Sequence, residues 1–244
     1  MIKRNFLGVL GGMGPLATAD FLKALATHTV AATDQDHIPI LLYGDCTTPD
    51  RTLSIVAGGP SPLPKLLEGV AFLNQSNVGA ICIPCNSAHH WFSELQAASN
   101  VPILHIGRAS VSQIKTKAPD AKIVGVLSTE GTHQSGIYLK ALAELGYKVV
   151  TPSPEEFASL VSPGIALIKS NNIREAERLF DLASSALIQR GAESIILGCT
   201  EIPIGMRRQT EQSPMFYVDS TEALALSAIE MFKNETYLFA KDTK

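Results

Sequence analysis

The sequence predicts an α/β fold of two pseudo-symmetric, duplicated α/β domains, with largely parallel sheets and a site in the cleft between the domains. Two observations carry this prediction. Short β-branched runs alternate with segments whose apolar residues recur at spacings of three and four, as in strands followed by amphipathic helices. Segments of the first half also reappear, in the same order, in the second half.

The β-branched runs predict strands at residues 5–10, 38–43, 80–83, 101–105, 122–127, 148–150 and 194–197. Helical spacing predicts helices at residues 17–29, 64–75, 134–145 and 173–190. A closing helix is predicted over residues 220–233, and the polar tail 235–244 is expected to fray. Because helices separate most of the strands, consecutive strands can run parallel.

The duplication is visible as matching segments at a nearly constant offset. The motif FLKALA at residues 21–26 reappears as YLKALA at residues 138–143, a shift of 117 positions that also carries Gly8 onto Gly125. A shift of 114 positions carries Cys85 onto Cys199. Chance similarity between Ala/Leu-rich helices is the alternative, but ordered matches favour duplication.

The duplication predicts a division of the chain into two domains. The first domain is expected to comprise residues 1–106 together with a returning C-terminal segment, 212–244. The second domain is expected to comprise residues 107–211.

Composition narrows the classes of function. The chain has 244 residues, of which 45% are hydrophobic and 18% charged, as is ordinary for a globular protein. Its net charge is -3 and no Lys/Arg run is longer than Arg207-Arg208, so nucleic acid is not an expected partner. Gly8 and Gly11 break the apolar start, which favours a strand over a signal segment. No apolar run approaches a spanning length, so we expect no membrane partner and a cytoplasmic location.

Two of the four cysteines occupy equivalent, reactive-looking positions. Cys85 and Cys199 each follow a buried strand and precede polar residues that can begin a helix, where backbone amides and the helix dipole stabilise a thiolate. In two facing copies, both thiols would point into one cleft. A pair of inert buried thiols is the alternative. Cys82 is expected in the core, and Cys46 lies near a turn with no activating neighbour.

Two other sites remain open at this point. Cys82 and Cys85 form a C-x-x-C, but residues three apart in a strand point to opposite faces; a zinc site from Cys85, His89 and Cys199 is a further possibility. The first turn, GGMGPLA at residues 11–17, weakly matches the dinucleotide fingerprint. Against a nucleotide, Pro15 and the turn at residues 128–132 suggest hydroxyl and amide loops suited to a small carboxylate.

Three motifs together resemble one family. They are GGMGP at residues 11–15, PCNSAH at 84–89 and GCTEIP at 198–203, and they resemble the aspartate racemase branch of the aspartate/glutamate (Asp/Glu/hydantoin) racemase superfamily. The resemblance extends through nearly the whole chain. It departs at Ser87, where the family usually has Thr, and this change keeps the hydroxyl group.

The resemblance implies a cofactor-independent amino-acid racemase that interconverts L- and D-aspartate, or glutamate, and forms a homodimer. Cys85 and Cys199 match its two catalytic bases. Arg51 and Lys169 match its cations for the side-chain carboxylate of a small dicarboxylic amino acid; a solvated surface charge is the alternative for each. The positions that the resemblance implies for the rest of the substrate are Met13, Asn86, Ser87, Thr129, Thr132, Thr200 and Glu201. Among these, Asn86, Thr129 and Thr200 would hold the α-carboxylate.

The expected chemistry agrees with the residues. Inversion of an α-carbon removes a proton from one face and returns one to the other, so two acid/base groups must flank the carbon. A thiolate and a thiol can do this. No lysine context for a pyridoxal Schiff base is evident, so we expect no cofactor and no metal, with amides, hydroxyls and cations stabilising the carbanion. Whether His89 or Glu201 tunes the thiols stays open.

Other activities within the superfamily also remain open. They are glutamate or hydantoin racemisation, maleate isomerisation and decarboxylation, because a fold does not select among them. A binding protein without turnover is a further class, and retention of both cysteines argues against it.

Overall fold

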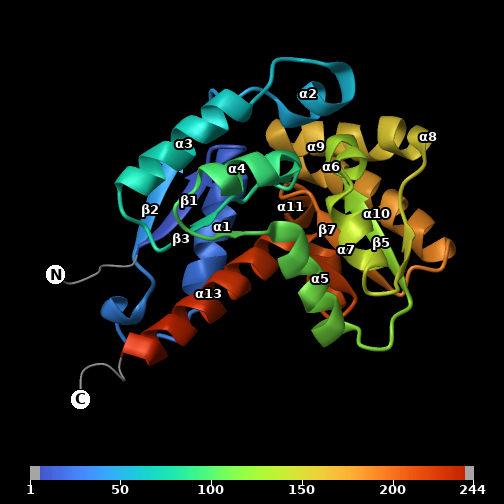
Figure 1. The fold of residues 1–244 in the computed structure, drawn as a ribbon. Helices are drawn as coiled ribbons and strands as arrows, with labels where there is room; N and C mark the ends of the chain where they lie inside the picture. Colours follow the sequence, from blue (N-terminus) through green and yellow to red (C-terminus); the bar gives the residue numbers. More distant parts are fainter. Residues whose placement is uncertain (1–5, 240–244) are drawn as a thin grey trace.

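The computed structural model describes residues 6–239 and contains two four-stranded parallel sheets with the same strand order, β2-β1-β3-β4 and β6-β5-β7-β8 (Figure 1). The strands of the first sheet are β1 (Leu7–Gly11), β2 (Ile40–Gly44), β3 (Ala80–Cys82) and β4 (Ile103–Leu104). Those of the second are β5 (Ile123–Ser128), β6 (Lys148–Val150), β7 (Ser194–Gly198) and β8 (Tyr217–Asp219). Two separate parallel sheets confirm the predicted duplicated α/β architecture.

Helices and helical turns cover the sheets and join the strands. The α-helices are α1 (Pro15–His28), α2 (Arg51–Ala57), α3 (Leu63–Gln75), α4 (Phe92–Ala98), α5 (Ile106–Lys117), α6 (Glu130–Ser135), α7 (Ile137–Ala143), α8 (Pro154–Glu156), α9 (Ser162–Lys169), α10 (Ile173–Gln189), α11 (Ile202–Gly205), α12 (Arg207–Gln212) and α13 (Ser220–Phe239). Short 3-10 turns are η1 (Asp34–Asp36) and η2 (Ser87–Trp91), and a π-helical turn is η3 (Phe157–Val161).

The duplication extends to the register of the strands. Gly8 of β1 pairs with Ile81 of β3, and Gly125 of β5 pairs with Ile195 of β7. These are the residues that the two sequence offsets connect. A Cβ at Gly125 would lie 2.9 Å from the Ile195 side chain, so glycine permits the same close strand packing in both copies.

Each half has its own core. In the first half, Leu7 and Phe21 are fully buried and pack with α13. In the second half, Leu187 of α10 and Leu197 of β7 are fully buried in one cluster, and Tyr138 occupies the position equivalent to Phe21 and is 2% exposed. The repeated apolar pattern thus places equivalent side chains in equivalent interiors.

The structure departs from the expected elements in several places, and helices α2, α5 and α9 are among those that were not expected. The helix expected over residues 134–145 is two helices, α6 and α7, because Gly136 adopts a left-handed φ of 71° between them. Strand β8 was not expected. The closing helix continues to Phe239, so residues 235–239 of the tail that was expected to fray are helical, and residues 240–244 lie outside the described residues.

The segment that follows residue 212 contacts both halves. Strand β8, at residues 217–219, pairs with β7 of the second sheet. From Ser220, α13 contacts α1 of the first half and α5, which begins at the boundary between the halves, and Figure 1 shows α13 running along the first half.

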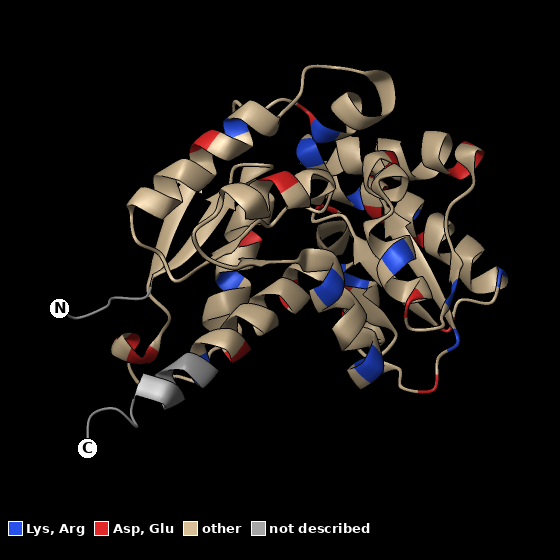
Figure 2. Cartoon of the chain, viewed as in Figure 1, with Lys and Arg blue, Asp and Glu red and all other residues tan. Residues whose placement is uncertain are grey.

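No helix within the described range is both long and apolar enough to cross a membrane. Figure 2 shows basic and acidic residues mixed along both halves of the described chain.

Candidate active site

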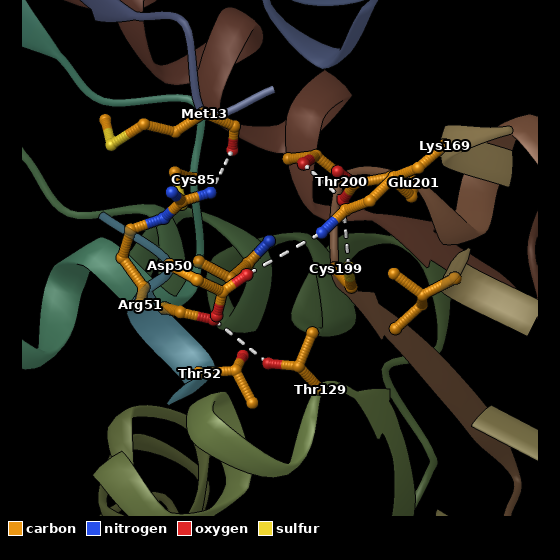
Figure 3. A pocket seen from close by; sticks show the side chains of 13 residues that line it. Met13, Asp50, Arg51, Thr52, Cys85, Thr129, Lys169, Cys199, Thr200 and Glu201 are labelled. Atoms are coloured by element: carbon orange, nitrogen blue, oxygen red, sulfur yellow. Dashed lines mark hydrogen bonds and ion pairs between the residues drawn. The ribbon is translucent and has the colours of Figure 1, made fainter. Parts of the chain in front are cut away.

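A cavity of about 30 Å³ lies between the two halves, beside the carboxyl ends of β3 and β7. Both copies of the strand-turn unit contribute to it, as expected for parallel sheets. The expected site residues that line it are Met13, Arg51, Cys85, Asn86, Ser87, Thr129, Lys169, Cys199, Thr200 and Glu201 (Figure 3). Thr132 is the expected residue that lies behind the lining, 1% exposed.

Cys85 lies at the end of the first sheet with a tightly fixed backbone. Its N–H donates to the Ile83 carbonyl at 2.8 Å, and its carbonyl oxygen lies 2.9 Å from Nδ1 of His89. The thiol side chain is 5% exposed and lines the cavity. Cys85 therefore presents its sulfur to the cavity from a constrained turn.

Arg51 lies beside Cys85 and is held by main-chain carbonyl groups. Its Nη1 donates to Thr48 and Pro49 at 3.2 and 3.0 Å, and its Nη2 donates to Met13 at 3.3 Å. Burial opposes the charged form, but the negative charge of a Cys85 thiolate is the largest influence that raises the pKa of Arg51. Among the described atoms, Arg51 Nε is buried without a hydrogen-bond partner. A cation with one free donor thus lies on the Cys85 side of the cavity.

Cys199 lies in the opposite electrostatic environment. Its Sγ donates to Oε2 of Glu201 at 3.1 Å, and Thr200 Oγ1 donates to the same oxygen at 3.2 Å. Burial first, and then the negative charge of Glu201, raises the pKa of Cys199 well above its usual value. Cys199 is therefore a thiol at neutral pH, while Figure 3 shows its carboxylate neighbour on the same side of the cavity.

Three hydroxyl groups join the halves next to the thiols. Ser87 Oγ lies 2.9 Å from both Thr129 Oγ1 and Thr132 Oγ1. Thr129 Oγ1 also caps α6 by accepting from the Thr132 N–H at 3.0 Å. Ser87 and Thr129 line the cavity, and Thr132 orients them from behind.

Asn86 lines the cavity, but its side chain is engaged elsewhere. Its Nδ2 donates to Ser220 Oγ at 3.0 Å, and its Oδ1 accepts from the Tyr138 hydroxyl. Burial raises the pKa of Tyr138, which keeps that hydroxyl protonated as the donor. The Asn86 amide therefore links the Cys85 turn to α7 and α13, which leaves one Nδ2 hydrogen for another acceptor.

The cavity also contains residues that the sequence reasoning missed. They are Asp50, Thr52 and Ile165. Asp50 caps α2, its Oδ1 accepting from the Leu53 N–H at 2.8 Å, and its Oδ2 lies 4.0 Å from Lys169 Nζ of the other half. A Pro-Asp pair before a helical pattern is a capping signal that could have indicated Asp50. Ile165 is one apolar position of a helix and carries no such signal.

The remaining cysteines behave as expected. Cys82 is fully buried, and burial raises its pKa, so it is an inert core thiol. Cys46 is exposed.

The zinc hypothesis does not fit the geometry of His89. Burial lowers the pKa of His89 to about 4, and both ring nitrogens bond to the main chain, Nδ1 with Cys85 and Nε2 with Ile106. No cluster of three potential metal ligands occurs within residues 6–239.

The first turn uses hydrogen-bonding groups within the protein, so few of them remain to bind a nucleotide phosphate. The Gly12 N–H donates to Thr18 Oγ1 at 3.0 Å, and Met13 accepts from Arg51. At Gly12, φ is 90° and a Cβ would lie 2.6 Å from the Asp45 backbone, so only glycine fits.

Comparisons with known proteins identify the family of this chain. The model of the Asp/Glu/hydantoin racemase family matches residues 10–228. The chain is 29% identical over 234 residues to the broad specificity amino-acid racemase RacX of Bacillus subtilis (strain 168), covering 93% of this chain and 97% of that protein. The solved Picrophilus torridus aspartate racemase is 30% identical with a TM-score of 0.82, covering 93% of this chain and 94% of the other.

A more distant structure shares the fold. Glutamate racemase from Francisella tularensis subsp. tularensis SCHU S4 has a TM-score of 0.69 at 20% identity, covering 96% of this chain and 83% of the other.

Proposed function

The chain belongs to the Asp/Glu/hydantoin racemase family, and from that premise we propose that it interconverts L- and D-aspartate by proton transfer between Cys85, Cys199 and the α-carbon. Family membership confirms the resemblance drawn from the three motifs, and the chain is an amino-acid racemase that works without pyridoxal phosphate. Aspartate as the substrate and the two thiols as the bases are the proposal.

One observation carries the mechanism: two thiols from equivalent turns of the two halves line one cavity, with unlike neighbours. In the proposed reaction a Cys85 thiolate, beside Arg51, removes the α-proton and becomes a thiol. The electron pair of the broken C–H bond stays on the α-carbon and spreads into the α-carboxylate. The Cys199 thiol then gives its proton to the opposite face and becomes a thiolate. This end state is the starting state for the other enantiomer.

The carbanion requires stabilisation where its charge develops. Asn86 Nδ2 and Arg51 Nε each keep a hydrogen for an acceptor at the cavity, in place of a cofactor that would delocalise the electron pair, whereas the Thr129 and Thr200 hydroxyls already donate to Thr132 and Glu201. Fixed N–H donors are effective because they need no reorientation during the reaction.

The charges around the cavity favour a dicarboxylic substrate. Arg51 and Lys169 both line it, one from each half, and Arg51 Nε has no partner within the described chain. One cation for each carboxylate, or both for the distal one, suits aspartate better than alanine. Asp50 and Lys169 lie 4.0 Å apart across the cavity, so a substrate carboxylate must displace Asp50 to reach Lys169.

We also propose a homodimer and a refined domain division. Open edge strand β2 carries exposed Ile40 and Leu42, 37% and 43% exposed, and Val30 nearby is 82% exposed; an apolar edge of this kind suits association with a second copy. The C-terminal segment rejoins the first domain at Ser220 in this proposal. Sedimentation that gave only monomer at micromolar concentration would rule out the dimer.

A racemisation assay without added cofactor tests the function. Circular dichroism would follow separate solutions of L- and D-aspartate, L- and D-glutamate, and L- and D-alanine toward zero rotation. Loss of signal from both aspartate enantiomers is expected, faster than from glutamate or alanine. Faster turnover of glutamate would replace aspartate as the substrate, and no change with any amino acid would overturn the proposal. Cys46→Ser is the matched control and should turn over like the parent.

A further inference from the structure

His89 is a buried, titratable residue that the proposed chemistry does not use. It is 2% exposed, its ring stacks on Phe92 with a centroid distance of 6.1 Å, and it lies 5.0 Å from the ring of His105. Its two nitrogens contact the main chain at both ends of a gap between the Cys85 turn and the start of α5. A buried histidine that bridges two segments in this way constrains their relative position.

The hydrogen-bond network fixes the tautomer of His89. The Ile106 N–H donates to Nε2 at 3.2 Å, so Nε2 carries the lone pair. Nδ1 therefore carries the hydrogen and donates to the Cys85 carbonyl at 2.9 Å. The Leu104 carbonyl, 3.5 Å from Nε2, can then be only a neighbour. The ring thus ties the Cys85 carbonyl to the first residue of α5, where the chain enters the second half.

In the second half, the carbonyl of the equivalent cysteine is held by a different kind of hydrogen bond. The offset of 114 positions that carries Cys85 onto Cys199 carries His89 onto Pro203, which has no side-chain donor. There the Cys199 carbonyl accepts from the main-chain N–H of Ile202 at 3.1 Å. Within the described residues, the hydrogen bond to the Cys85 carbonyl comes from His89. Only one of the two thiols thus depends on a side chain for the placement of its backbone.

We propose that His89 is a positioning residue for Cys85 alone, setting the direction of that sulfur through the Nδ1–H bond to the Cys85 carbonyl. The inference rests on the proposed function, because it concerns one of the two proton-transfer half-reactions. The Cys85 backbone is then held from both sides, by Ile83 at its N–H and by His89 at its carbonyl. Loss of the His89 donor frees the carbonyl and lets the sulfur move relative to the α-carbon.

Two amide variants distinguish the role of the hydrogen bond at Nδ1 from that of the hydrogen bond at Nε2. In Asn, the amide nitrogen is bonded to Cγ, as Nδ1 is in His, so His89→Asn keeps a donor near the Cys85 carbonyl. In Gln, the amide lies one bond further out, so His89→Gln reaches toward Ile106 and loses that placement. If the bond to Cys85 is what matters, Asn restores function and Gln does not.

The test isolates each thiol. In a Cys199→Ser background only Cys85 can remove an α-proton, exchange it with solvent and return a deuteron in deuterated water; in a Cys85→Ser background only Cys199 can. Mass spectrometry measures deuterium incorporation into each enantiomer of aspartate. Adding His89→Gln should slow the Cys85 exchange on the order of 100-fold, the effect of a displacement near 1 Å, and leave the Cys199 exchange within about twofold. Adding His89→Asn should leave both exchange rates within about tenfold of the rates in the same single-cysteine backgrounds with His89 intact.

His105→Ala is the matched control. His105 lies against His89 and caps α5 by accepting from the N–H groups of Gly107 and Arg108, but it has no bond to the Cys85 turn. It should lower the thermal unfolding temperature without changing the ratio of the two exchange rates.

The outcomes distinguish the two proposals. Equal slowing of both thiols by His89→Gln, or no slowing of either, would overturn the positioning role. Equal slowing by Asn and Gln would overturn the role of the Nδ1 bond. If neither single-cysteine background exchanges either enantiomer, the proposed function itself fails, whatever the His89 variants do.

Discussion

Cys85 and Cys199 end equivalent strands of two sheets with the same order, yet their surroundings carry opposite charge. Cys85 faces the guanidinium of Arg51, while Cys199 donates a hydrogen bond to the carboxylate of Glu201. The backbone that follows them also differs, because a histidine side chain holds one carbonyl and a main-chain N–H holds the other. Duplication has kept the placement of the thiols and not their environments.

This difference teaches how one protein can hold two identical groups in unlike states. A racemase of this type needs one thiolate and one thiol at the start of each turnover. Burial and the carboxylate beside Cys199 raise the pKa of that thiol and keep it protonated before any substrate arrives. The asymmetry also predicts that substitutions near one thiol act on one face of the substrate.

The largest effect is expected from removing either thiol. Cys85→Ser and Cys199→Ser should each lower the racemisation rate by about 1,000-fold or more, because a hydroxyl supplies no usable base near pH 7. Each variant should still exchange the α-proton of one aspartate enantiomer, and the two variants should prefer opposite enantiomers. Polarimetry and deuterium incorporation measure the two quantities.

Cys82→Ala is the control for a buried thiol outside the cavity. It should racemise aspartate at close to the parent rate, with a lower unfolding temperature from lost packing. Exchange of the same enantiomer by both serine variants would contradict the assignment of one thiol to each face.

The next largest effect concerns the cation beside Cys85. Arg51→Ala should cost about 2–4 kcal/mol in kcat/KM for aspartate, because it removes charge-assisted hydrogen bonds that the substrate's carboxylate would make. Alanine has no distal carboxylate, so its slower turnover should fall much less. Parallel assays of both substrates measure the difference.

Arg208→Ala is a control for loss of charge alone. Arg208 is exposed and paired with Glu177 and Asp181, away from the cavity. Unchanged kinetics of Arg51→Ala on aspartate would show that Arg51 does not bind the carboxylate of the substrate.

The sequence predicted where the two thiols lie in the fold, but it did not predict how their surroundings differ. Backbone placement follows from strand periodicity and from the offset between Gly8 and Gly125, which are local and repeated signals. Strand β8 has three residues and no periodicity, so its pairing is fixed by tertiary contact with β7. Asp50 and Ile165 reach the cavity through the packing of the halves, which no local pattern encodes.

The sequence also did not predict which groups the Asn86 side chain contacts. The resemblance to the racemase family implied that Asn86 holds the α-carboxylate, but Tyr138 and Ser220 engage its amide. Both partners are distant in the chain, so their approach depends on how α7 and α13 pack against the first half.

The carboxylate beside Cys199 should set the pH at which that thiol works. Glu201→Gln removes the negative charge that raises the pKa of Cys199, so that pKa should fall toward its usual value and more thiolate should form at a given pH. Exchange by Cys199 alone, in the Cys85→Ser background, should therefore reach its maximum at lower pH. A fall of one unit in pKa would give about tenfold faster exchange on the acidic side of the profile.

The single-thiol background is necessary for that measurement. The two enantiomers have equal free energy in water, so kcat/KM must be equal in both directions for the intact pair, which conceals any one-sided change. The same substitution in the Cys199→Ser background is the control, and the exchange profile of Cys85 should shift less. A shift of both profiles by the same amount would show that Glu201 acts on the cavity as a whole.

The smallest effect is expected where the two halves meet across the cavity, at Asp50 and Lys169. Their charged atoms lie 4.0 Å apart and both side chains are about half exposed, so the pair stabilises the contact between the halves by no more than about 1 kcal/mol.

Asp50 pairs with Lys169, the cation that the distal carboxylate of the substrate would use. Asp50→Asn should keep the cap of α2, since Asn accepts from the Leu53 N–H as Asp does, while it releases Lys169. We therefore expect kcat/KM for aspartate to rise by up to about fivefold at low salt, with the gain lost at high salt, and no change for alanine. A similar rise for both substrates would mean that the substitution eases opening of the halves and leaves carboxylate binding unchanged.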